Sequence, residues 1–116
     1  MIRITKLDKY YNKGRANEIH VIDQTSLEFG NTGLVCILGE SGSGKTTLLN
    51  TIGGLDTFQA GEITIDEVTF RNYSATELEK LRNEKFGYIF QDQYLLSEET
   101  AEYNIRLALN MYEISE

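Results

Sequence analysis

The sequence has 116 residues, of which 41% are hydrophobic, and this is enough for one domain with a modest core but too little for two domains. It carries 11 basic and 18 acidic residues, and its lysines and arginines form no cluster of the kind that neutralises a phosphate backbone, so no nucleic acid is expected as a partner. The N-terminus lacks the apolar stretch of a signal peptide, and the best candidate for a membrane span, residues 34–38, is far shorter than the roughly 18 residues required. We therefore expect a soluble, cytoplasmic chain.

The first third of the chain is predicted to be rich in β-structure. Residues 2–7 alternate between apolar and polar side chains, as a half-buried strand does, and the polar stretch 12–18 reads as a loop. Two short strands are expected at residues 19–22 and 26–29, followed by a glycine-containing turn at residues 30–33.

An uninterrupted apolar run at residues 34–38 is typical of a strand that is covered on both faces in a parallel sheet. The single cysteine, Cys36, lies inside this run, so we expect it to be buried and unreactive in a reducing compartment. A glycine-rich stretch ends the run. From residue 45 to residue 52 the apolar positions have helical spacing, and Gly53 and Gly54 supply a stop. The predicted order is strand, glycine loop, helix.

The second half of the chain begins with a predicted hairpin, formed by residues 62–65 and 68–70. Ser74 and Glu77 have the spacing of a capping box, which predicts the start of a surface helix that continues to about residue 83.

Another apolar strand is expected at residues 86–90, directly before the polar residues 91–93. Two apolar stripes at helical spacing then predict a last helix that is apolar on most sides. These stripes consist of Ile105, Ala108, Leu109 and Tyr112, and of Leu107, Met111 and Ile114.

The glycine-rich stretch matches the phosphate-binding pattern G-x-x-x-x-G-K-[ST] at every fixed position. Glycines allow successive backbone N–H groups to converge on one anion, and the helix that follows adds its positive end. The loop consists of Gly39, Glu40, Ser41, Gly42, Ser43, Gly44, Lys45 and Thr46.

Two side chains at the end of this loop have predicted roles in binding a nucleotide. Lys45 would neutralise charge on the β- and γ-phosphates, and the hydroxyl of Thr46 is placed to coordinate Mg²⁺. The alternative is a glycine-rich turn between a strand and a helix, with an exposed lysine.

The succession of motifs along the chain resembles the ATP-binding subunit of ABC transporters, and most nearly the branch that serves lipoprotein release, macrolide export and antimicrobial-peptide export. The resemblance runs from Met1 to about Met111. It implies an α/β fold like that of P-loop NTPases, with an antiparallel β portion and the start of a helical subdomain. The segments that carry it are Tyr11, residues 39–47, residues 49–56, residues 60–62 and residues 87–91.

The resemblance also assigns roles to single residues. Tyr11 stands where the family has an aromatic residue that stacks on adenine. The alternatives are that Tyr11 packs at the end of its strand, or that Tyr10 beside it takes this place. Thr47 extends the nucleotide-binding loop. Gln91 corresponds to the Q-loop glutamine, whose amide oxygen reaches Mg²⁺ or the attacking water; the alternative is a surface glutamine after a strand. His20 precedes the phosphate loop and is not the family's switch histidine, so we expect a structural role for it.

Several parts of a complete ABC ATPase have no counterpart in residues 1–116. They are the signature motif, the Walker B aspartate, the glutamate that polarises water and the switch histidine, which lie in the second half of proteins about twice as long. Residues 63–67 end in Asp-Glu, but they alternate and lie in the predicted hairpin, so they are no Walker B motif. We therefore interpret residues 1–116 as a partial ABC-type ATP-binding domain, which binds ATP without efficient hydrolysis. Without the strands that lead to the absent motifs, it must repack, associate or expose two apolar edges.

Three functional readings follow. In the first, the chain is the energy-coupling ATPase subunit of an exporter and binds ATP with Mg²⁺. It forms a homodimer with a second ATP-binding subunit. A membrane-embedded permease holds it at the inner face of the cell membrane. The residues after Asp92 would begin the part that docks on this permease, or would be plain core. The alternatives are a small nucleotide-binding module or inactive fragment that does not hydrolyse ATP, and a small kinase. A kinase leaves Tyr11 and residues 87–91 unexplained.

Overall fold

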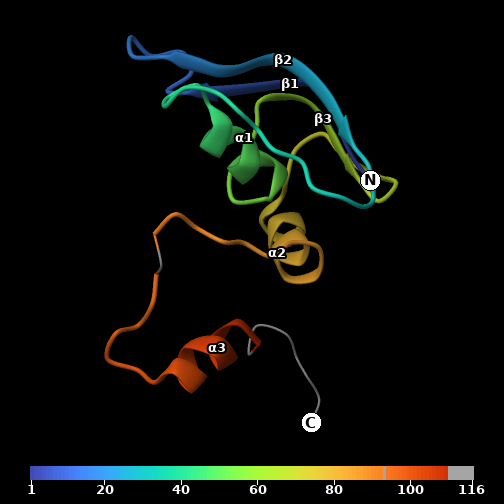
Figure 1. Cartoon of the computed structure of the whole chain (residues 1–116). Helices are drawn as coiled ribbons and strands as arrows, with labels where there is room; N and C mark the ends of the chain where they lie inside the picture. The colour runs from blue at the N-terminus through green and yellow to red at the C-terminus, as the bar shows by residue number, and fades with distance from the viewer. Residues whose placement is uncertain (93, 110–116) are drawn as a thin grey trace.

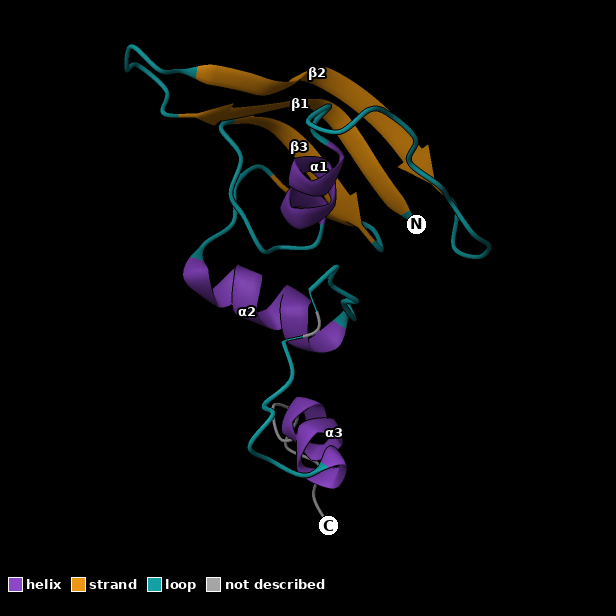
Figure 2. Cartoon of the chain, turned by 60° about the vertical axis from the view of Figure 1, so that its left-hand side comes forward, coloured by secondary structure: helices purple, strands orange, loops and turns teal. Residues whose placement is uncertain are grey.

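The fold is built on a four-stranded antiparallel sheet, seen in a computed structural model that describes residues 1–92 and 94–109. The strands lie in the order β2-β1-β3-β4, of which Figure 1 labels β2, β1 and β3. β1 spans Ile2–Tyr11, β2 Ile19–Phe29, β3 Ala60–Ile65 and β4 Val68–Phe70. Helix α1 (Lys45–Ile52) lies against one face of the sheet, and α2 (Ala75–Glu84) follows it below (Figure 2). Helix α3 (Ala101–Leu109) lies apart from the sheet in both views.

The two N-terminal strands confirm the predicted β-rich start and the loop at residues 12–18. The short strands predicted at residues 19–22 and 26–29 form the single strand β2. The polar residues between them remain in the strand because β1 runs alongside and Thr25 pairs with Leu7.

The predicted hairpin is formed by β3 and β4, which pair antiparallel. Both residues of its turn have positive φ, 47° at Asp66 and 72° at Glu67. Two positive φ angles are what a two-residue turn needs in order to match the twist of the flanking strands. The capping box of α2 is also confirmed, since the Ser74 hydroxyl accepts from the Glu77 amide and the Glu77 carboxylate accepts from the Ser74 amide.

The core lies between the sheet and the first two helices. β1 and β3 contribute Ile4, Leu7 and Ile63, none of which is more than 1% exposed. Burying a side chain of this kind stabilises the folded state by about 1.5–3 kcal/mol. The remaining buried apolar residues are Ile22, Ile52, Phe58, Ile65, Tyr73 and Leu81.

The strand predicted at residues 34–38 is not present, and that prediction was wrong. Leu34 and Leu38 are each 90% exposed, and Cys36 is exposed as well, although we expected it to be buried. A fully apolar strand needs a hydrogen-bonded neighbour at its side and a layer on each face. The described part of the chain provides no such neighbour, because its one sheet contains only β1 to β4.

The strand predicted at residues 86–90 is likewise absent, and Ile89 is fully exposed. Together with residues 33–37 and α1, this segment borders a cleft of about 630 Å³. In the single chain, most residues of these two apolar segments are exposed. The last predicted helix is confirmed as α3, but Met111, Tyr112 and Ile114 lie outside the described residues.

Candidate nucleotide-binding site

The glycine loop, residues 39–44, joins the exposed segment 34–38 to helix α1. The Ser43 amide donates to the Glu40 carbonyl oxygen at 3.2 Å, which closes a turn inside the loop. Gly42 has a φ of 80° and Gly44 a φ of 93°. These angles lie in the left-handed region, where a residue without Cβ carries no steric cost. The glycines therefore give the loop the curvature that was predicted for it.

Gly44 is also the N-cap residue of α1. Its carbonyl oxygen accepts the first helical bond, from the Leu48 amide at 2.9 Å, but it has no side chain that could cap the amides of the first turn. The first turn contains no acidic residue. Uncapped N–H groups and the positive end of the helix dipole together favour an anion at this position.

The Lys45 side chain folds back over the loop. Its ammonium group donates to the carbonyl oxygen of Glu40 at 2.9 Å and also to that of Gly39. A cation is thus held at the place where the loop amides begin, and an incoming phosphate can replace these two carbonyl contacts with stronger, charge-assisted bonds. Of the predicted loop residues, Gly39 to Gly44 form the loop, and Lys45 and Thr46 are the first residues of α1.

Tyr10 and Tyr11 lie on opposite faces of β1, because successive side chains of a strand alternate. The Tyr10 ring stacks on His20 at 3.9 Å between centroids, and Lys13 Nζ lies 4.6 Å from its centroid. Tyr11 instead reaches α1, where its hydroxyl lies 3.4 Å from Thr47 Oγ1. The structure thus brings Tyr11 and Thr47, both predicted site residues, next to the phosphate loop.

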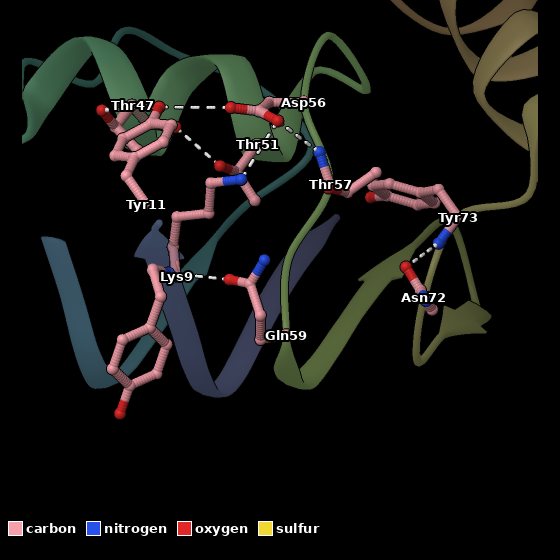
Figure 3. Close-up of polar contacts among 10 residues, drawn as sticks. Lys9, Tyr11, Thr47, Thr51, Asp56, Thr57, Gln59, Asn72 and Tyr73 are labelled. Carbon is pink, nitrogen blue, oxygen red and sulfur yellow. Dashed lines mark hydrogen bonds and ion pairs between the residues drawn. The ribbon is translucent and has the colours of Figure 1, made fainter. Parts of the chain in front are cut away.

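Tyr11 belongs to a polar cluster that the sequence did not predict, and which we call the Asp56 cluster: Lys9, Tyr11, Thr47 and Asp56 (Figure 3). Asp56 lies in the loop between α1 and β3 and accepts from the Tyr11 hydroxyl at 3.2 Å and from Lys9 Nζ at 3.0 Å. One signal could have revealed it. Lys9 follows buried Leu7 at the two-residue spacing of one strand face, and a lysine on a buried face needs a carboxylate partner.

Gln91 and Thr46, the two predicted metal ligands, line the same 630 Å³ cleft. One comes from the segment after residue 90 and the other from the end of the phosphate loop. Amide and hydroxyl oxygens are suitable ligands for Mg²⁺, which binds few protein groups and keeps several waters. Both side chains therefore offer the kind of oxygen that binds Mg²⁺, and their role as metal ligands stays a prediction.

His20 has the structural role that was expected. Its Nε2 atom lies 2.8 Å from Asp8 Oδ1, and its ring packs on Tyr10. The backbone amide of Gln24 donates to the same carboxylate at 3.0 Å. This amide first of all, and His20 second, hold the pKa of Asp8 below its usual range.

Comparison with known proteins decides the family. The sequence profile described as "ABC transporter" matches residues 22–116, which is most of the chain. The chain belongs to the ABC transporter family. This confirms the resemblance that its motifs indicated.

Named ABC relatives are proteins of export and release systems. The chain is 41% identical over 107 residues to the macrolide export ATP-binding/permease protein MacB of Mannheimia succiniciproducens, covering 92% of this chain and 16% of that protein. It is 44% identical over 92 residues to the lipoprotein-releasing system ATP-binding protein LolD of Francisella tularensis subsp. holarctica, covering 79% of this chain and 40% of that protein. The chain thus spans less than half the length of these two relatives.

Solved ABC cassettes have the same fold. The dimeric, post-hydrolysis structure of MJ0796 bound to ADP and Pi superposes with a TM-score of 0.87 at 33% identity, covering 100% of this chain and 50% of that one. A second dimeric structure of MJ0796, described as a bacterial ABC transporter cassette, gives the same TM-score of 0.87 at 34% identity. The predicted class, an α/β P-loop NTPase fold with an antiparallel portion, is confirmed. Within residues 1–92 and 94–109, no helix is both long and apolar enough to cross a membrane.

Proposed function

We propose that this chain binds Mg²⁺-ATP at residues 39–47 and forms part of the energy-coupling ATPase of an exporter. One observation carries the proposal: the positive-φ glycines, the uncapped start of α1 and the Lys45 ammonium all lie at one place. A loop of this kind binds a polyphosphate through backbone N–H groups, and the lysine adds a positive charge to the β- and γ-phosphates.

Mg²⁺ would be held by the Thr46 hydroxyl and the Gln91 amide oxygen, which share one cleft. When bound, the ion neutralises phosphate charge and orients the terminal phosphate. The chain's own contribution is to place these two oxygens, to bind the phosphates along the loop, and to offer the Tyr11 ring to the base. Lys45 and Gln91 are the residues of this chain that we assign to the reaction itself.

Efficient hydrolysis also needs a positioned water and stabilisation of the transferring phosphoryl group. Residues 1–116 contain no counterpart of the family motifs that do this, so we propose that the chain by itself binds ATP but releases little phosphate. Turnover would need the rest of a cassette and a second ATP-binding subunit, and a permease would hold the assembly at the inner face of the membrane. The names of MacB and LolD support an exporter, and the MJ0796 dimer supports pairing of cassettes.

Retention of labelled ATP and release of phosphate by the purified chain test this proposal together. We expect retained ATP in the presence of Mg²⁺, no retention by Lys45→Ala, and little phosphate release by either protein. Phosphate release by the 116-residue chain at the rate of a complete ABC ATPase would contradict the proposed division of labour.

A further inference from the structure

We propose that Asp56 is a positioning residue of the nucleotide site, because it fixes the Tyr11 hydroxyl and so holds the aromatic ring in one orientation for stacking on a nucleobase. This inference rests on the proposed function, since it concerns the base end of the same nucleotide. It concerns the residues of the Asp56 cluster (Figure 3).

The Asp56 carboxylate is fixed by contacts other than the one with Tyr11. Its Oδ1 atom accepts from Lys9 Nζ at 3.0 Å and from the Thr57 backbone amide at 2.8 Å. The Asp56 amide donates back to the Asn50 carbonyl oxygen of α1 at 3.2 Å. The remaining oxygen, Oδ2, accepts from the Tyr11 hydroxyl at 3.2 Å. The hydroxyl is therefore bound to an acceptor whose position is fixed from three sides.

Lys9 determines which face of the Tyr11 ring a base can use. Its ammonium lies 4.9 Å from the ring centroid, and its side chain is only 4% exposed. A cation over the ring attracts the π-electrons and covers that face. Tyr11 is 36% exposed, so part of the side chain remains accessible to a ligand. A ring that is covered by a cation on one face can accept a stacked base only on the other face.

Stability alone does not explain an ion pair whose lysine is buried and whose aspartate is 32% exposed. The desolvation of the lysine offsets much of its attraction to the carboxylate, and an apolar residue at its position is often equally stable. What the ion pair adds is a defined geometry: the carboxylate can accept from Tyr11 and Lys9 at the same time. This geometry points to a site in which the orientation of the ring matters.

Thr47 connects this base platform to the phosphate loop. Its Oγ1 atom lies 3.4 Å from the Tyr11 hydroxyl, and it follows directly after Thr46 in α1. The ring and the phosphate-binding amides are thus attached to the same helix. Asp56 and the Tyr11 hydroxyl lie outside residues 39–47, so a change at either of them should weaken the contribution of the base to affinity and leave that of the phosphates intact.

The test compares the affinities of the chain for Mg²⁺-ATP and for Mg²⁺-tripolyphosphate, which has the phosphates but no base. Tyr11→Phe keeps the ring and removes only the anchored hydroxyl. We expect it to bind ATP about three- to tenfold more weakly, the equivalent of one hydrogen bond, and to bind tripolyphosphate as the wild type does. Tyr10→Phe is the matched control, and it should change neither affinity.

Asp56→Ala should weaken ATP binding at least as much as Tyr11→Phe, and the double variant should be no weaker than Asp56→Ala alone, because the two residues act through one contact. Asp56→Ala leaves the Lys9 ammonium without its carboxylate, so the folding of this variant is checked by circular dichroism. If Asp56→Ala does not fold, the result for Tyr11→Phe tests the inference by itself.

The inference is overturned if Tyr11→Phe keeps the wild-type ratio of the two affinities, or if the wild type binds tripolyphosphate as tightly as ATP. In both cases the phosphate site, and with it the proposed function, would stand. If the wild type bound neither ligand, the proposed function itself would fail.

Discussion

Leu7 and Gly61 approach so closely that a Cβ atom placed on Gly61 would lie 2.7 Å from the Leu7 Cα atom. The two residues belong to the neighbouring strands β1 and β3, and Gly61 has a φ of 95°. Real Cβ atoms do not come this near to backbone, so only glycine fits without moving a strand. The close approach keeps β3 in place beside the strand that carries Lys9 and Tyr11.

Gly61→Ala should therefore destabilise the fold more than a change of backbone conformation alone would. Gly14→Ala is the matched control, because Gly14 also has positive φ, 79°, but has open space around it. Gly14→Ala should lower the free energy of unfolding by about 1–2 kcal/mol, because alanine is strained in the left-handed conformation. Gly61→Ala should lower it clearly more. Urea unfolding followed by circular dichroism measures both losses. Equal losses of stability in the two variants would mean that β1 and β3 can move apart to accommodate the Cβ atom without cost.

The Asp8 carboxylate makes stability depend on pH. Its pKa is lowered in the folded state by the Gln24 amide and by His20, so the charged form is favoured on folding. A lowered pKa stabilises the fold above the unfolded-state value, near pH 4, and this contribution is lost as the pH falls through the folded-state value.

Replacing Asp8 by Asn tests this dependence. At pH 7 the variant should unfold at a lower urea concentration than the wild type, because its side chain has no charge for the Gln24 amide and His20 to stabilise. Below the folded-state pKa of Asp8 the two proteins should become similar. A difference that stays constant from pH 7 to about pH 2 would show that the contact is insensitive to protonation.

The sequence predicted the elements whose causes are local. The alternation in β1, the capping box of Ser74 and Glu77, the hairpin turn and the helix after the phosphate loop each depend on residues within a few positions of one another. The phosphate loop was predicted for the same reason, since glycines and a helix start are sufficient to curl a backbone around an anion.

The missed features depend on residues that are distant in sequence. The apolar run 34–38 indicates burial, but burial requires neighbouring strands, and the described residues do not supply them. Likewise, Asp56 lies 47 positions from Lys9 and 45 from Tyr11. The place of Lys9 on a buried strand face indicates that it needs a carboxylate, but no local pattern identifies Asp56 as that partner. Tyr11 could be separated from Tyr10 only once their opposite faces and different neighbours were known.

The exposed apolar segments beside the 630 Å³ cleft should make the chain self-associate. Leu34→Lys and Ile89→Lys together should reduce association without loss of stability, because the first side chain is 90% exposed and the second is fully exposed. Leu81→Lys places the same charge in the core and should unfold the chain. Sedimentation and urea unfolding measure the two effects. If the exposed substitutions also destabilised the chain, these segments would be packed in solution.

Gln91 should contribute to nucleotide affinity only when Mg²⁺ is present. Residues that support a metal ion typically change its affinity by about tenfold or more when removed, and a direct ligand should do no less. We therefore expect Gln91→Ala to weaken Mg²⁺-dependent ATP binding by about this factor and to leave binding in EDTA unchanged. Gln91→Glu keeps an oxygen ligand and should retain the Mg²⁺ effect. An equal loss with and without Mg²⁺ would assign Gln91 to another role.

Titration calorimetry with Mg²⁺-ATP tests the phosphate site most directly. The Lys45 ammonium must exchange its carbonyl contacts with Gly39 and Glu40 for contacts with phosphate, so Lys45→Ala should weaken binding by about 100-fold. Lys80→Ala, at an exposed position in α2, should bind as the wild type does. A folded wild-type chain that gives no more heat than Lys45→Ala would show that residues 39–46 do not bind a nucleotide.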